Sequence, residues 1–386
     1  MNKQTVIGIV AGEASGDILG QSIMHSLKMR CPSVRFVGVG GPHMQKEGME
    51  SIGQIETLSV MGLIEPLKKL PQILRLKKNI ISHFKKDPPA CFIGIDAPDF
   101  NLRLEKILKN KKIKTMHLVS PTIWAWRANR IHDIKKAVDL MLLIFPFEKE
   151  IYDRHRVPAC YIGHPIADSI EMTSDKFKAR AALKLDPDAQ WLALMPGSRD
   201  AELRYLANDF FLTAKWLKQK VPNLKFIVPC VNEARFNQVK EILQSFPDLQ
   251  DVHLVLEQSI TAMQASDAIL LASGTAALQA ALIKRPCVVA YRMSGFTYQI
   301  AKRLVKAKYM ALPNIIADKI LMPEFLQDAV QPEAMGKVLL EYIKDPSACE
   351  ELLTEFQRIH KTLKCDAGDK AAEAILKFIS QKSEQK

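Results

Sequence analysis

The chain has 386 residues, and its 54 Lys and Arg residues exceed its 42 Asp and Glu residues, which gives a formal net charge of +12. This length predicts two domains, each able to bury a core without disulfides. With 48 % apolar and 25 % charged residues, the composition excludes a disordered or fibrous protein, and the basic excess indicates a polyanionic or membrane-surface partner.

The apolar segments are too short for a membrane-spanning helix. The longest uncharged stretch, Ala268–Ile283, is shorter than the ~20 residues that cross a bilayer. The first apolar run is typical of a strand rather than of a signal peptide. We therefore expect any membrane contact to be peripheral. The seven cysteines form no C-x-x-C motif, which predicts reduced thiols.

In the first half of the chain, short β-branched runs alternate with segments of helical periodicity. The predicted strands are Thr5–Val10, Val34–Val39, Cys91–Ile95, Ile113–Val119, Val138–Ile144 and Ala159–Ile162. The predicted helices are Gly16–Met29, Pro71–Lys86, Phe100–Lys111 and Asn129–Lys136.

The second half repeats this alternation. Its predicted strands are Trp191–Met195, Leu224–Pro229, Val252–Val255, Ala268–Leu271 and Cys287–Ala290. Its predicted helices are Glu202–Lys220, Glu233–Gln244, Thr275–Ile283 and Phe296–Lys306, followed by a largely helical C-terminal stretch.

Such alternation predicts an α/β fold with two doubly wound, Rossmann-like domains that face a cleft. We expect an N-terminal domain over 1–165, a C-terminal domain over 166–345, and C-terminal helices over 346–386 that pack across both. Because ligands of open α/β sheets bind at the carboxyl ends of the strands, the loops there are the candidate site.

Acidic residues follow two strands of the first domain. The loop after the first strand carries two glycines together with Glu13, Ser15 and Asp17. The strand Cys91–Ile95 ends in Asp96, and Asp99 stands three residues later. Asp99 is well placed to cap the next helix, whereas Asp96 has no such local role. Asp96 is therefore the candidate general base, with a structural turn carboxylate as the alternative.

The loop Ser120–Arg127 contains Trp124 and Trp126, which either stack on a sugar or belong to the core.

In the second domain, Ser198 and Arg199 follow a strand and fit a diphosphate contact, with a solvated arginine as the alternative. Ser273, Gly274 and Thr275 open a second helix start suited to an anion. Gln279 lies one turn further on the same face, and Arg292 could also neutralise a diphosphate. The Asp186-Pro187-Asp188 run matches a metal-binding pair, but its central proline favours a turn, so no catalytic metal is expected.

The segment Pro66–Lys86 holds seven basic residues and no acidic one. Its helical projection places an apolar arc between flanking bases, which is typical of a helix lying on anionic lipid. The alternative is an ordinary helix that covers the sheet. The residues assigned to a membrane contact are Ile73, Leu76, Lys77, Lys78 and Ile80. No motif favours nucleic acid.

Five motifs together resemble the lipid-A-disaccharide synthase family (glycosyltransferase family 19). They are Val10–Asp17 (VAGEASGD), Gly94–Asn101 (GIDAPDFN), Ser120–Arg127 (SPTIWAWR), Pro196–Arg199 (PGSR) and Ala272–Leu278 (ASGTAAL), in this order over nearly the whole chain. The resemblance implies an inverting GT-B transferase without cofactor or metal. It would move 2,3-diacylglucosamine from its UDP donor to the 6-hydroxyl of 2,3-diacylglucosamine 1-phosphate, giving the β-1,6 disaccharide and UDP.

The family pattern implies roles for single residues. Asp96 would be the base, with Glu13, Ser15, Asp17 and Asp99 on the acceptor side. Ser198, Arg199, Ser273, Gly274, Thr275, Gln279, Arg292 and Asn314 would bind UDP. Gln279 departs from the pattern, because such transferases commonly place there a Glu that accepts from the ribose hydroxyls, which puts the nucleotide affinity in doubt.

The family also implies attachment to the cytoplasmic face of the inner membrane, and a homodimer stays open. Two other functions remain to be separated from the transferase. One is a UDP-sugar epimerase or hydrolase of the same fold, and the other is a basic module that binds RNA or lipid without catalysis.

Overall fold

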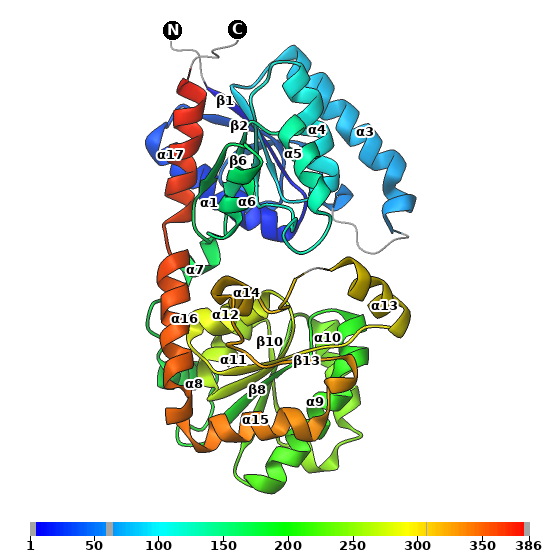
Figure 1. Cartoon of the computed structure of the whole chain (residues 1–386), viewed down its shortest axis with the longest axis vertical. Coiled ribbons are helices and arrows are strands. Elements are labelled where there is room, and N and C mark those ends of the chain that lie inside the picture. The colour runs from blue at the N-terminus through cyan, green and yellow to red at the C-terminus, as the bar shows by residue number, and fades with distance from the viewer. Residues whose placement is uncertain (1–4, 59–64, 306, 382–386) are drawn as a thin grey trace. The chain divides into compact units, whose positions relative to one another are not determined.

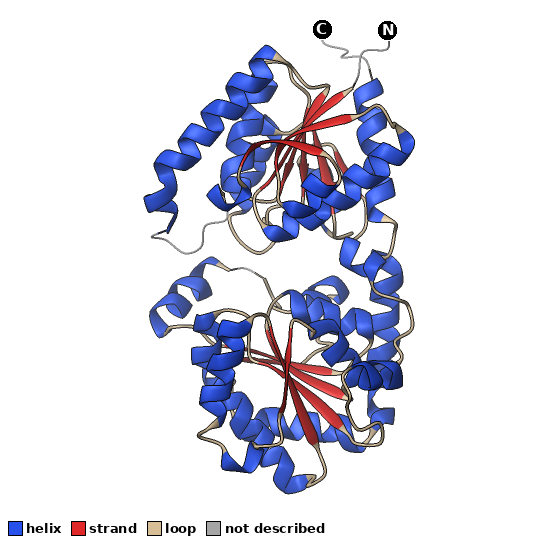
Figure 2. Ribbon diagram, turned by 180° about the vertical axis from the view of Figure 1, so that it is seen from behind, coloured by secondary structure: helices blue, strands red, loops and turns tan. Residues whose placement is uncertain are grey.

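A computed structural model describes residues 5–58, 65–305 and 307–381 of the chain. It divides into unit 1, residues 1–168 and 363–386, and unit 2, residues 169–362. Each unit is an α/β layer structure with a parallel sheet between helices (Figures 1 and 2). The two parallel sheets confirm the predicted fold class.

Unit 1 contains seven strands in the order β3-β2-β1-β4-β5-β6-β7. They are β1 Val6–Ala11, β2 Arg35–Val39, β3 Met49–Gly53, β4 Cys91–Ile95, β5 Thr115–Leu118, β6 Leu140–Leu143 and β7 Ala159–Tyr161. The helices are α1 Ala14–Arg30, α2 Pro42–Lys46, α3 Glu65–Lys86, α4 Pro98–Asn110, α5 Ile131–Ala137, α6 Glu148–Arg154, α7 Pro165–Ser169 and α17 Ala367–Ser380. Helices α3, α4 and α5 cover one face of the sheet, and α1 and α17 pack together on the other (Figure 1).

Unit 2 contains six strands in the order β10-β9-β8-β11-β12-β13. They are β8 Trp191–Met195, β9 Lys225–Cys230, β10 His253–Leu256, β11 Ala268–Ala272, β12 Cys287–Tyr291 and β13 Glu324–Leu326. The helices are α8 Lys176–Ala182, α9 Asp200–Lys220, α10 Glu233–Leu243, α11 Ser259–Ala265, α12 Thr275–Ile283, α13 Gly295–Leu304, α14 Leu312–Ala317, α15 Pro332–Lys344 and α16 Glu350–Leu363. One face packs on α9, α10 and α15, and these form the largest core of the unit.

Both sheets reverse their strand order at one point. In unit 1 the reversal lies between β1 and β4, and in unit 2 it lies between β8 and β11. At such a point the loops leave the two neighbouring strands in opposite directions and open a crevice for ligands. The candidate site therefore belongs to the loops after these four strands.

The C-terminal helices are distributed over both units. Helix α16 lies in unit 2, whereas α17 packs on α1 in unit 1. Within the stretch 346–386, where C-terminal helices are expected, the boundary between the units lies at Leu363.

Helix α3 buries much of the apolar arc that was assigned to lipid. Leu76 is 6 % exposed, Ile80 and Phe84 are fully buried, and Phe84 packs on Phe92 of β4. The assignment of Leu76 and Ile80 to a membrane contact is therefore wrong, because both side chains cover the sheet. None of the described helices is long and apolar enough to cross a bilayer.

Candidate active site

The turn after β4 holds Asp96 in a constrained backbone conformation. Asp96 and Ala97 both have positive φ angles, 51° and 43°, a region that is costly for residues with a side chain. The Asp96 N–H donates to the Leu118 carbonyl at 2.9 Å, and Asn101 Nδ2 donates to the Asp96 carbonyl at 2.8 Å. Two neighbouring elements thus fix the turn, while the half-buried Asp96 carboxylate has no partner within the described chain.

The loop after β1 packs directly against this turn. A Cβ added to Gly12 would lie 2.2 Å from the Cβ of Ala97, far inside a normal contact. Gly12 therefore allows the two loops at the strand reversal to approach each other.

We expect Gly12→Ala to lower kcat by at least tenfold, because the added methyl must displace the Asp96 turn and small displacements of a catalytic group are costly. Steady-state kinetics with circular dichroism as a folding control checks this. Gly295→Ala is the matched control, because nothing lies within 4 Å of a Cβ at Gly295. Equal effects of the two substitutions would contradict the packing argument.

The residues predicted on the acceptor side differ in whether their side chains are accessible to a ligand. Glu13 and Ser15 are exposed at the start of α1. Asp17 is 2 % exposed, and its carboxylate accepts from the backbone N–H groups of Gly41, His43 and Met44 at 2.8–3.0 Å. The assignment of Asp17 to the acceptor is therefore wrong, because these three bonds commit it to the start of α2.

Asp99 also has a different local role from the one expected. Helix α4 begins at Pro98 with Ala97 as its N-cap, so Asp99 lies in the first turn and does not cap the helix. Its carboxylate is 75 % exposed and pairs with Arg130. Asp99 is still available at the surface, but as half of an ion pair.

Two buried carboxyl groups near this edge of the sheet were missed by the sequence analysis. Glu105 of α4 contacts His117 of β5 at 2.7 Å with both side chains fully buried, and burial raises the pKa of Glu105 although His117 opposes the shift. Glu148 is 1 % exposed, and burial raises its pKa to about 8. Neither residue lies in a recognisable motif, so only the packing identifies them.

Glu148 is buried beside the two loops that follow β5 and β6. It accepts from the Phe145 N–H at 3.2 Å, whereas the Ser120 hydroxyl donates to the Pro121 carbonyl at 3.0 Å and Trp124 Nε1 is buried without a hydrogen-bond partner. Ser120 in turn contacts the Tyr152 hydroxyl at 2.7 Å. This network fixes the base of the Ser120–Arg127 loop.

The two tryptophans of that loop have different environments. Trp124 is partly buried and packs edge-on against Phe147, with ring centroids 5.5 Å apart. Trp126 is 37 % exposed, and the Arg127 guanidinium lies 4.2 Å from its ring centroid. Trp124 thus supports the loop, and Trp126 is the tryptophan that can stack on a ligand.

In unit 2 a pocket of about 320 Å³ lies at the strand reversal. Its lining comes from the carboxyl ends of β8, β9, β10 and β11 and includes the predicted residues Ser198, Thr275 and Gln279. It also includes Glu257, a carboxylate that the sequence analysis did not identify. The pocket therefore has hydroxyl, amide and carboxylate groups that can bind a ribose.

The two helix starts at this pocket are not equivalent. Glu202 accepts from the backbone N–H groups of Ser198 and Arg199 at 2.9 and 3.1 Å, so its carboxylate occupies the place that an anion would take at α9. A Cβ at Gly274, before α12, would meet nothing within 4 Å. The prediction of two anion-receptive helix starts is therefore wrong for α9, and Ser273, Gly274 and Thr275 at α12 remain.

Two other predicted nucleotide residues are committed elsewhere. Arg292 pairs with Asp209 and donates to the Val330 carbonyl at 3.0 Å. Asn314 is fully buried; its amide donates to Met322 and Glu324 and accepts from two backbone N–H groups. The assignment of Asn314 to UDP is wrong because its hydrogen-bonding capacity is used, and Arg292 mainly ties α9 to the end of β13.

The suspected metal pair is a turn, as predicted. The Asp188 N–H donates to Asp186 Oδ1 at 3.0 Å, which closes the turn around Pro187. Within the described ranges, His, Cys, Asp and Glu form no group of three or more that could hold a metal ion.

Known proteins are similar to this chain over nearly its full length. The family model described as lipid-A-disaccharide synthetase matches residues 7–376. The lipid-A-disaccharide synthase of Pectobacterium atrosepticum is 47 % identical over 380 residues, which cover 98 % of this chain and 99 % of the relative.

Solved structures show the same fold at low sequence identity. A glycotransferase of kitacinnamycin has a TM-score of 0.64 at 12 % identity and covers 97 % of this chain and 99 % of its own. A UDP-GlcNAc 2-epimerase from Neisseria meningitidis has a TM-score of 0.61 at 12 % identity, with the same coverage. These likenesses establish the GT-B fold, and the match over residues 7–376 shows that the chain belongs to the lipid-A-disaccharide synthase family, whose members are glycosyltransferases of lipid A biosynthesis.

Proposed function

We propose that the protein transfers 2,3-diacylglucosamine from UDP to the 6-hydroxyl of 2,3-diacylglucosamine 1-phosphate, with Asp96 as the general base. The observation that carries this proposal is the free, half-buried Asp96 carboxylate in a fixed turn at the strand reversal of unit 1. A pocket at the corresponding reversal of unit 2 supplies the groups for the nucleotide.

The transfer balances as a single displacement. The acceptor 6-oxygen forms a bond to the anomeric carbon of the donor, while the bond from that carbon to the β-phosphate oxygen breaks. Asp96 takes the hydroxyl proton, and UDP leaves with the bonding electron pair. Backbone N–H groups at the start of α12 and the Arg199 guanidinium stabilise the charge that develops on the diphosphate.

The experiment is an assay in detergent micelles with diacylated donor and acceptor, scored for the disaccharide by mass. Donor alone must stay intact, and UDP must appear only when acceptor is added. UDP release or a changed sugar from the donor alone would instead support the epimerase or hydrolase.

We expect Arg199→Ala to weaken UDP binding by roughly 10- to 100-fold, since a guanidinium that donates to a diphosphate contributes about 1.5–3 kcal/mol. Isothermal titration of UDP measures this. Arg204→Ala is the matched control, because Arg204 is on the same helix, is similarly exposed and pairs with Asp200. If both variants bind UDP as the unmodified protein does, Arg199 is a solvated arginine.

For the lipid substrates we propose that α3 contacts the cytoplasmic face of the inner membrane. Leu70 and Leu74 are 46 % and 49 % exposed, and Arg75 and Lys78, next to Leu74 and one turn after it, are exposed as well. This supports a contact through the first half of the described helix together with Ile73, Lys77 and Lys78. Co-sedimentation with phosphatidylglycerol vesicles should exceed that with phosphatidylcholine vesicles and fall with added salt, and equal binding to both would contradict the contact.

A further inference from the structure

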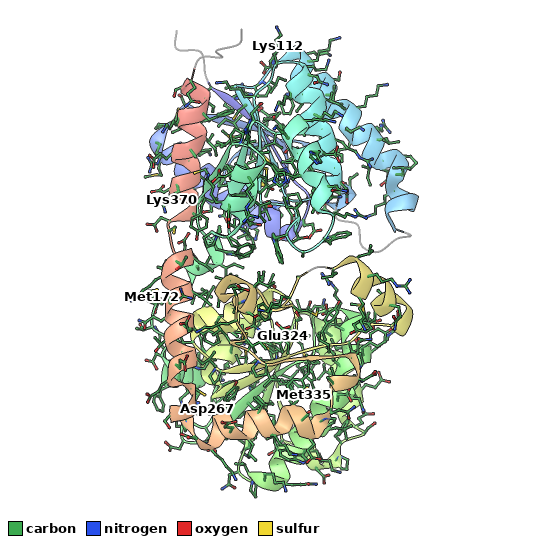
Figure 3. The ribbon with its side chains drawn as sticks, viewed as in Figure 1. Lys112, Met172, Asp267, Glu324, Met335 and Lys370 are labelled. Carbon is green, nitrogen blue, oxygen red and sulfur yellow. The ribbon has the colours of Figure 1, made fainter. Side chains whose placement is uncertain are left out.

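Unit 2 has a second pocket, of about 440 Å³, at the opposite edge of its sheet from the nucleotide pocket. Three of its lining residues stand immediately before strands: Gln190 before β8, Asp267 before β11 and Pro286 before β12. The strands are parallel, so their amino ends meet at this edge. Figure 3 labels Asp267, one of the residues at this edge. Nothing in the proposed transfer uses this pocket.

Positive charge dominates the pocket. Lys176, Lys284 and Arg285 line it, and the buried Arg180 lies behind Asp267. Asp267 forms ion pairs with two of these cations, since its carboxylate accepts from Lys176 at 2.6 Å and from Arg180 at 2.8 Å. The other lining carboxylate, Asp175, caps α8 by accepting from the Lys178 N–H at 3.0 Å. The lining thus holds three cations and two carboxylates, and Arg180 adds a fourth cation behind Asp267, so the formal surplus of the pocket and its support is about two positive charges.

Arg285 is a lining cation without a direct ion pair in the described structure, although the charge of Asp267 acts on it from a distance. Its guanidinium donates to the Gln264 carbonyl at 2.8 Å and the Lys284 carbonyl at 3.2 Å, and in the described structure it is in ion-pair distance of no carboxylate. Its Nε atom is buried without a hydrogen-bond partner. Burial lowers the pKa of Arg285, so its cation is less stable here than in water. An anion in the pocket would stabilise this group.

The rest of the lining combines the polar residues Ser174, Gln190 and Ser266 with an apolar and aromatic part. Phe177, Tyr342 and Leu353 belong to three different helices and meet at the pocket. A ligand that complements both the charged and the apolar part of the lining has a dianionic head, which balances the surplus charge, and an apolar body. A phosphate monoester carries ≈ −1.5 to −2 charges at neutral pH.

We propose that this pocket is a binding site for a small organic phosphate with an apolar body, separate from the nucleotide pocket. The inference is independent of the proposed transferase activity. It rests on the lining, the charge surplus and Arg285, which has no direct ion pair and a buried Nε atom without a hydrogen-bond partner.

The test is isothermal titration of phenyl phosphate into the full-length protein at fixed ionic strength, with and without saturating UDP. One phenyl phosphate should bind per chain with the same affinity in both conditions, and inorganic phosphate should bind more weakly at the same site. Absence of saturable binding, or loss of binding when UDP is present, would overturn the proposal.

Three variants locate the binding. Arg285→Gln should weaken phenyl phosphate binding at least tenfold, while Arg285→Lys should restore much of it because the charge is kept. If Arg285→Gln unfolds, as judged by calorimetry, Lys176→Gln takes its place with the same expectation. Lys178→Gln is the matched control, an exposed lysine on the same helix that does not line the pocket. Equal losses in Lys178→Gln and in the pocket variants would contradict the site.

Discussion

Replacing Asp96 by Asn should lower kcat by roughly 10²–10⁴-fold, the usual contribution of a general base, with little change in KM. The amide has the shape of the carboxylate but cannot take the proton of the acceptor hydroxyl. The fold should be unaffected, because the Asp96 carboxylate supports no other described group. Asn also tolerates the positive φ angle of 51° at this position better than most residues.

The measurement is disaccharide formation under saturating donor and acceptor, together with UDP affinity and melting temperature. Asp153→Asn is the control, because Asp153 is an exposed carboxylate of unit 1 that pairs with Lys149. A variant with near-normal kcat would show that Asp96 is only a turn residue. A variant with unchanged kcat/KM but a lower melting temperature would lead to the same conclusion.

The sequence predicted the central strands because both faces of a parallel sheet are covered. Their β-branched runs are therefore apolar throughout, and β4 and β8 begin and end at the predicted residues. Two of the four described edge strands, β3 and β13, lack this signal, whereas β7 and β10 were predicted. Strand β3 contains Glu50, which pairs with Arg35 of β2, and β13 has only three residues. Both were missed because polar or very short edge strands resemble loops.

The candidate site was predicted as far as local sequence determines it. The strand-end loops and Asp96 follow from the order of the strands and the glycine positions. The roles of Asp17 and Asn314 do not, since each depends on which backbone N–H groups come near its side chain in the folded chain. Asp17 meets amides 24 to 27 residues away. The sequence around a carboxylate near a strand end does not distinguish a residue that binds a ligand from one that caps a helix.

The Glu148→Gln variant should be more stable than the unmodified protein at high pH and similar to it at low pH. Glu148 has a pKa of about 8 in the folded protein, raised by burial from 4.5. The folded state thus holds one more proton than the unfolded state between these values, and stability must fall as the pH rises through this window. Above pH 8 the full cost is roughly 5 kcal/mol as an upper bound, from about 1.36 kcal/mol per pKa unit.

Calorimetric melting from pH 5.5 to pH 9 measures this difference. Gln keeps an oxygen for the Phe145 N–H but never ionises, so the advantage of the variant should grow with pH. His164 also titrates in this unit, since burial lowers its pKa to about 4, but its contribution is common to both proteins and cancels in the difference. Glu150→Gln is the control, because Glu150 is exposed on the same helix and pairs with Arg154. Parallel curves for Glu148→Gln and the unmodified protein would mean that Glu148 ionises freely in the folded protein. The group next to the Ser120–Arg127 loop would then be a carboxylate anion instead of a neutral carboxyl group.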